Sequence, residues 1–239
     1  MLPFLGEYFG NPSSIHRVGR KARAILDDSR ERVAQVWKCK ASEVVFTSGA
    51  TESVCHEICG TARFLKSKGR HLITSAVEHH AVLHTVEYLV NKEGFELTTL
   101  PVDAEGRVAP QNLYSSIRDD TILVSLMAAN NETGVLQPWT EVHDLCLSHK
   151  VPFFCDAAQW IGKLPAKGLG ECDFVSGCAH KFGGPKGVGF LKCPSHGPVR
   201  SQLVGGPQEE GRRAGTENVA SVLSMMAALK ERETLLIES

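Results

Sequence analysis

The stretch Val44-Val45-Phe46-Thr47-Ser48-Gly49-Ala50-Thr51-Glu52-Ser53 joins an apolar run to a helical pattern through a glycine-containing turn. A short apolar run bounded by such a turn is typical of a buried strand. The helix is predicted to begin near Thr51, so its first backbone N–H groups and a hydroxyl would lie at the turn, where they could bind an anion. Because Ser and Thr also cap ordinary helices, this stretch alone leaves phosphate binding and simple capping equally open.

The same strand-then-helix pattern recurs on both sides of this stretch. Strands are predicted at 44–47, 71–74, 97–102, 121–126, 151–155, 174–175 and 188–191, and helices at 51–66, 80–92, 111–117, 139–149 and 219–238. Residues 1–35 are predicted to form a loop followed by an amphipathic helix rich in Arg and Lys. This alternation predicts an α/β fold with a mostly parallel sheet sandwiched by helices. Ligands of such sheets bind at the carboxyl ends of the strands.

Composition excludes several classes of protein. The 239 residues carry 26 Lys and Arg against 27 Asp and Glu, and 42% are hydrophobic, as in an ordinary globular protein. No block of like charges indicates a nucleic-acid or membrane surface. The first residues, from Met1 to Glu7, lack the basic and long apolar regions of a signal peptide, so neither a membrane partner nor a nucleic-acid partner is expected.

Eight cysteines raise the question of disulfides or a metal. No pair has C-x-x-C spacing, although Cys55, His56 and Cys59 could form half of a metal site on one helix face. The simpler interpretation is that these are small core residues in a reducing cytoplasm. We therefore expect no metal site and a cytoplasmic location.

Asp156 ends the predicted strand that includes Phe154 and Cys155. An isolated carboxylate there would be costly, so it needs a cationic or hydrogen-bonding partner. A protonated pyridine nitrogen would be such a partner and would keep a pyridine ring an effective electron sink. The alternative is that Asp156 simply caps the following helix, and the residue alone favours that alternative.

The third stretch, Ser176-Gly177-Cys178-Ala179-His180-Lys181-Phe182-Gly183-Gly184-Pro185-Lys186-Gly187, places a lysine in a glycine-rich loop after a strand. Such a lysine could be an amine nucleophile toward an aldehyde cofactor. The order of residues does not match G-x-x-x-x-G-K-[ST], which disfavours a nucleotide-binding P-loop.

Together and in this order, the three stretches resemble the class V aminotransferases of fold-type I, pyridoxal 5'-phosphate (PLP) enzymes, and within them the NifS-like cysteine desulfurases. The resemblance runs from Gly10-Asn11-Pro12-Ser13-Ser14 to Arg213-Ala214-Gly215-Thr216-Glu217-Asn218, through Ser75-Ala76-Val77-Glu78-His79-His80, Asn130-Asn131-Glu132-Thr133-Gly134 and Gly205-Gly206-Pro207-Gln208-Glu209. It implies that residues 1–239 form the large PLP-binding domain. The family's opening strand and its C-terminal small domain are expected to be missing.

The resemblance also implies a role for each matching residue. Lys181 would bind PLP covalently and move protons at the substrate carbon, and His79 would stack on the ring; these two are the expected catalytic residues. Asp156 would pair with the pyridine nitrogen, Gln159 with the ring hydroxyl oxygen, and Asn131 would line the ring. The phosphate would be held by the Ala50 backbone, Thr51, Cys178 and His180, and by Thr216 across a homodimer interface.

The implied reaction takes sulfur from L-cysteine, giving alanine and an enzyme persulfide that passes sulfur to an acceptor protein for iron–sulfur cluster or thio-cofactor assembly. Cys178 departs from the family's usual phosphate-binding Ser, and Val54 and Cys55 replace a polar, Asn-containing pair. The family's sulfur-accepting cysteine and carboxylate-binding arginine belong to the small domain, and Cys193 is a poor substitute. Three alternatives stay open: a selenocysteine lyase or other class V aminotransferase, an inactive module for dimerisation or partner binding, and a metalloprotein.

Overall fold

A computed structural model describes the backbone of residues 1–238 and shows one seven-stranded sheet in this range. The strands are β1 (Val44–Thr47), β2 (His71–Ser75), β3 (Glu96–Leu100), β4 (Thr121–Met127), β5 (Phe153–Asp156), β6 (Phe174–Cys178) and β7 (Gly189–Lys192). The helices are α1 (Pro3–Gly6), α2 (Arg17–Trp37), α3 (Ala50–Leu65), α4 (His80–Glu93), α5 (Pro110–Ser116), α6 (Trp139–His149) and α7 (Val219–Glu238). No helix within residues 1–238 is long and apolar enough to cross a membrane.

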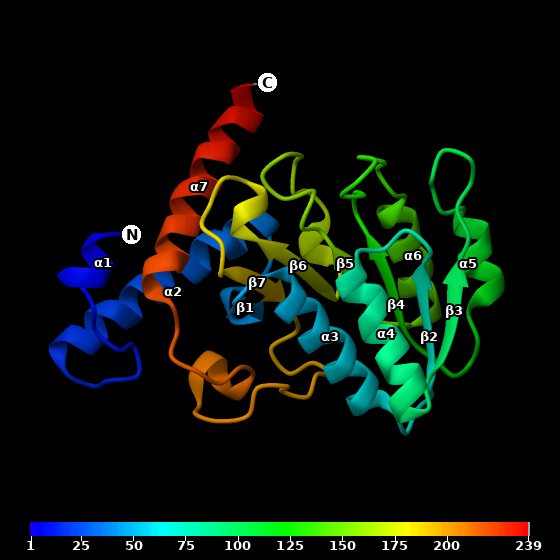
Figure 1. Ribbon diagram of the computed structural model, residues 1–239, viewed down its shortest axis with the longest axis horizontal. Helices are drawn as coiled ribbons and strands as arrows, with labels where there is room; N and C mark the ends of the chain where they lie inside the picture. Colours follow the sequence, from blue (N-terminus) through cyan, green and yellow to red (C-terminus); the bar gives the residue numbers. More distant parts are fainter. Residues whose placement is uncertain (239) are drawn as a thin grey trace.

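The strand order is β1-β7-β6-β5-β4-β2-β3 (Figure 1). The neighbours from β6 through β5, β4 and β2 to β3 pair in parallel, whereas β7 runs antiparallel to both β6 and β1. The predicted mostly parallel sheet is therefore confirmed, with β7 as the reversed strand. Helices connect most of the parallel strands, as parallel pairing requires.

Successive residues of the central strands pack on opposite faces of the sheet, because side chains alternate along a strand. Phe153, Val175 and Phe190 belong to a core with α2, α6 and α7, whereas Phe154 and Leu191 belong to a second core with α3 and α4. Both faces are buried, which is why these strands are continuous apolar runs rather than alternating ones.

Several predicted strand ends differ from the structure, most by one residue and the end of β6 by three, and proline explains two of the larger differences. Strand β3 ends at Leu100 rather than Val102, and β5 begins at Phe153 rather than Val151. Pro101 and Pro152 lie at these ends and have no backbone N–H for a sheet. Val102 instead forms an isolated bridge to Val108, and the Val151 N–H bonds to the Cys146 carbonyl at the end of α6.

Glu57 lies in the core between α3 and the sheet, with no exposed surface. Neither of its carboxyl oxygens hydrogen-bonds another part of the described chain. Burial raises the pKa of Glu57 well above its ordinary value, so the folded protein holds a proton that the unfolded chain releases. A raised carboxyl pKa means that stability is lost as pH rises above the ordinary glutamate range.

We predict that Glu57→Met stabilises the protein by about 1–3 kcal/mol at pH 8, because an unpartnered buried carboxyl is replaced by an apolar side chain that adapts to its site. The gain should shrink as the pH falls and be smallest below about pH 4, where the carboxyl is protonated in both the folded and the unfolded state. Chemical denaturation across this pH range measures both effects. Glu87→Met, at an exposed site on α4, is the matched control. A gain that does not vary with pH would contradict the prediction.

Candidate active site

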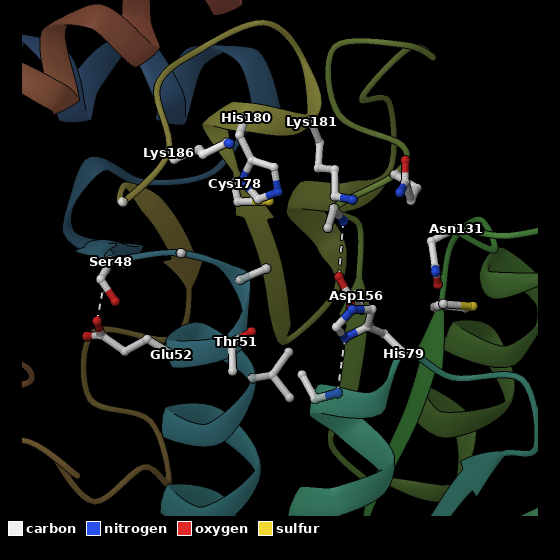
Figure 2. Close-up of a pocket in the computed structure, with 18 of the residues that line it drawn as sticks. Ser48, Thr51, Glu52, His79, Asn131, Asp156, Cys178, His180, Lys181 and Lys186 are labelled. Carbon is white, nitrogen blue, oxygen red and sulfur yellow. Dashed lines mark hydrogen bonds between the residues drawn. The ribbon is translucent and has the colours of Figure 1, made fainter.

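A cavity of about 420 Å³ opens where β4, β5 and β6 end and α3 begins. Figure 2 shows side chains converging on it from these elements and from the start of α4. Its lining comprises Ser48, Gly49, Ala50, Thr51, Glu52, Val54, His79, Ala81, Met127, Ala129, Asn131, Asp156, Ala158, Gln159, Cys178, His180, Lys181, Lys186 and Gly187. This is the size of a typical small-molecule site.

The amino-terminal end of α3 forms one wall of the cavity. Gly49, the residue before the helix, provides no side-chain cap, so the first-turn N–H groups are left to a ligand. Its φ of 155° is a conformation that glycine adopts readily, and a Cβ there would meet no atom within 4 Å. Strand β7 passes close to Gly49. A Cβ on Gly189 of β7 would lie 2.7 Å from the Gly49 Cα, so residue 189 must also be glycine.

Cys178 ends β6 opposite this helix terminus and is almost fully buried. Burial and then Asp156 raise the pKa of its thiol, while the backbone N–H groups of Ala50 and Lys181 oppose the rise. His180 and Lys186 complete this side of the cavity, where Figure 2 shows them close together. Burial, followed by the charges of Lys181 and Lys186, lowers the pKa of His180.

Asp156 lies at the end of β5, in the wall of the cavity. Its Oδ1 atom accepts hydrogen bonds from the Ser176 hydroxyl at 2.8 Å and from the Ala158 N–H at 3.1 Å. Its Oδ2 atom makes no hydrogen bond within the described chain and is available to a donor. Burial raises the pKa of Asp156. The hydrogen bonds from Ala158 and Ser176 lower it again, and the charges of His79 and Lys181 lower it by smaller amounts.

The alternative that Asp156 caps a helix is wrong, because residues 158–164 form turns rather than a helix. The Ala158 N–H bond closes a local Asx turn instead.

His79 is the residue before α4, and its Nδ1 accepts a hydrogen bond from the Ala81 N–H at 3.0 Å. This bond leaves the proton of the neutral ring on Nε2 and holds the ring at the cavity wall (Figure 2). Asn131 reaches the cavity from the turn after β4, and its side-chain amide donates to Glu132 at 2.6 Å.

Thr216 is the predicted site residue that this cavity does not include. It is exposed, in the segment before α7. Two ion pairs anchor this segment: Arg213 bonds Glu52 at 2.7 and 3.1 Å, and the buried Glu209 accepts from Arg30 at 2.6 and 2.9 Å. The segment is thus held beside the amino-terminal end of α3, with Thr216 outside its own chain's cavity.

The structure thus brings nine of the ten predicted site residues to one cavity: Ala50, Thr51, His79, Asn131, Asp156, Gln159, Cys178, His180 and Lys181. Sequence reasoning did not assign Ser48, Glu52, Met127, Lys186 or Gly187 to it. Lys186 and Gly187 belong to the glycine-rich loop, and that loop could have indicated phosphate binding even though it does not match a P-loop. Nothing in the sequence pairs Glu52 with Arg213. Within the range that the structure describes, no cluster of three or more His, Cys, Asp or Glu could hold a metal ion.

Comparison with known proteins adds an independent observation. A family model described as Aminotransferase class-V matches residues 1–238. The chain is 47% identical over 232 residues to "Cysteine desulfurase IscS" of Dictyoglomus turgidum, covering 96% of this chain and 58% of that protein. The solved structure "NIFS-LIKE PROTEIN" superposes with a TM-score of 0.95 at 39% identity, over 99% of this chain and 66% of that one. The structure "SspA in complex with cysteine" has a TM-score of 0.91 at 33% identity, over 99% and 72%.

The Arg213–Glu52 ion pair yields a prediction, because both side chains are largely shielded from water, with 17% and 16% exposed. Arg213→Met leaves the Glu52 carboxylate without its partner and should cost about 1–3 kcal/mol of stability, measured by chemical denaturation. Proteolysis within residues 205–215 should also become faster. Arg32→Met, which breaks an exposed pair with Asp28, should cost no more than about 0.5 kcal/mol. Equal effects of the two substitutions would contradict the prediction.

Proposed function

Because this chain belongs to the class V aminotransferase family, we propose that its cavity binds PLP and that it is the cofactor-binding part of a cysteine desulfurase. The chain spans 58% of the length of the Dictyoglomus relative, so the activity, substrate and partners of a whole protein are part of this proposal. The observation that carries it is that Lys181, Asp156, His79 and the uncapped end of α3 line one cavity.

The residues present fit the cofactor. Uncapped N–H groups at Ala50 and Thr51, with His180 and Lys186 opposite, suit a phosphate. The Oδ2 atom of Asp156 is open to a ring N–H, and Lys181 offers an amine for the aldehyde carbon. Gln159 would contact the ring hydroxyl oxygen, Asn131 the ring edge, and Thr216 the phosphate bound by a second copy in a homodimer.

Bound PLP supplies an electron sink for negative charge at the substrate α-carbon. Three residues of this chain would act on the ring and on the substrate proton. The Asp156 carboxylate would keep the ring nitrogen protonated, the Lys181 Nζ would remove and return the proton at the α-carbon, and the His79 ring would stack on the cofactor ring. His79 keeps its orientation because Ala81 holds its Nδ1.

We propose L-cysteine as substrate, with alanine and a persulfide as products and an acceptor protein for the sulfur in iron–sulfur cluster or thio-cofactor assembly. The names of the relatives and the cysteine bound in the SspA structure support it. Cys193 does not suit the attack on sulfur, because burial raises the pKa of its thiol to about 11. The attacking thiolate would belong to the part of the relatives' length that this chain does not span. All eight cysteines are free, which supports a cytoplasmic location.

The experiment that tests cofactor binding is the visible absorption spectrum with added PLP. We predict a band for wild type and for Lys92→Ala, an exposed lysine of α4, but no band for Lys181→Ala. Borohydride should fix the cofactor on the peptide that contains Lys181, as mass spectrometry would show. A band that survives in Lys181→Ala, or a label on Lys186, would contradict the assignment. Alanine and sulfide released from L-cysteine then test the reaction.

Cys178 gives a second prediction. A hydroxyl donates a stronger hydrogen bond than a thiol, so Cys178→Ser should lower the dissociation constant for PLP about three- to tenfold, measured by titration. Cys39→Ser, at a half-buried site outside the cavity, should leave it unchanged. Unchanged or weaker binding by a correctly folded Cys178→Ser protein would show that this side chain does not contact the phosphate.

A further inference from the structure

The turn that follows β5 is held rigidly by its own backbone. The N–H groups of Trp160 and Ile161 both bond the Ala157 carbonyl, at 2.9 and 3.0 Å, and those of Lys163 and Leu164 both bond the Trp160 carbonyl, at 3.1 and 3.0 Å. The Trp160 indole N–H also bonds the Pro165 carbonyl at 2.9 Å. Lys163 therefore has a fixed backbone position, four residues after Gln159.

The same turn packs against the segment that carries Lys181. Gly162 has a φ of 73°, and a Cβ there would lie 2.5 Å from the Cβ of Phe182. The two backbones can approach this closely only because residue 162 is glycine. Lys163 is thus placed beside the cavity, although it is not part of its lining.

Gln159 does line the cavity, and its side-chain oxygen accepts a hydrogen bond from the Lys163 ammonium group. An ammonium group can only donate, so the amide atom that it contacts must be oxygen. The Gln159 Nε2 donor is then directed away from Lys163 and makes no hydrogen bond within the described chain. An amide held in this way offers the cavity a donor rather than an acceptor.

We propose that Lys163 is a positioning residue that fixes the amide of Gln159 with its Nε2 donor toward the ring oxygen of bound PLP. The inference rests on the proposed cofactor binding and deepens it. A deprotonated ring oxygen accepts a hydrogen bond from Nε2 but would be repelled by Oε1, so the orientation of one amide decides between attraction and repulsion.

The surroundings of Lys163 agree with this position. Burial lowers the pKa of Lys163, and the charge of Lys181 lowers it further, whereas Cys178 raises it and Arg232 of α7 lowers it. The other titratable or charged groups that line the cavity are Glu52, His79, Asp156, His180 and Lys186. Glu52 is paired with Arg213, whereas the Gln159 oxygen accepts from Lys163, an exposed residue at the edge of the cavity.

The test is a pH titration of the visible band of PLP bound to the full chain. A donor to the ring oxygen stabilises the form that has lost the proton from the nitrogen linking Lys181 to PLP, and so lowers the midpoint. Lys163→Met should raise the midpoint by about 1 pH unit. Lys163→Arg, which keeps a donor and a charge, should stay near wild type, as should Lys167→Met, which removes another exposed lysine of the same segment.

A double-mutant cycle separates positioning from the bare charge of Lys163. In a Gln159→Leu background, Lys163→Met should produce no further shift, because the amide that it orients is gone. A shift of equal size in that background would overturn the proposal, since Lys163 would then act by charge alone. An unshifted midpoint in Lys163→Met would also overturn it and leave cofactor binding intact. Absence of a visible band in wild type would remove the proposed cofactor binding and this inference with it.

Discussion

The parallel pairing of β4, β5 and β6 is the constraint on which the candidate site depends. The register places Met127 and Asp156, the last residues of β4 and β5, beside each other, and Asp156 beside Ser176, two residues before the end of β6. That register brings the Ser176 hydroxyl to 2.8 Å from the Asp156 carboxylate. A shift of one residue in either pairing would turn these side chains to the other face of the sheet. The positions of these cavity side chains are therefore determined by the strand register rather than by the loops.

Buried carboxyl groups show how the fold divides structural from chemical roles. Glu78 is buried, and its Oε1 accepts from the Ser75 hydroxyl and the Met127 N–H, both at 2.8 Å. Burial raises the pKa of Glu78 to about 8, so a neutral carboxyl ties the turn before His79 to the end of β4. Asp156 is equally enclosed by protein but borders the cavity. A buried carboxyl group with an oxygen facing the cavity, such as Asp156, can bind a ligand, whereas one bonded only to the protein, such as Glu78, stabilises the fold.

The sequence predicted which segments along the chain form strands and main helices, because each is a strong apolar pattern bounded by turn residues, but it did not predict the order of the strands in the sheet. It also predicted that residues as distant as Ala50, Asp156 and Lys181 would meet, since each follows a strand of a parallel sheet. It missed contacts that depend on tertiary placement of irregular segments. Glu209 reaches the buried Arg30 from a loop far along the chain, and the two residues share no local pattern. Nor does the sequence show that the missing side chain of Gly162 allows the turn that contains Lys163 to pack against Phe182.

Charge within the cavity is arranged along one direction. At the end near α3, positive potential comes from the uncapped helix terminus and from Lys186, while the Glu52 carboxylate there is neutralised by Arg213. On the β5 side, Asp156 is the carboxylate that remains open. A ligand with an anionic group at one end and a protonated nitrogen at the other would be oriented by this arrangement before any covalent bond forms. The same field opposes the reversed orientation, which would place the anionic group beside Asp156. Because Lys181 lines the same cavity, orientation by charge also selects which carbon of the ligand its amine meets.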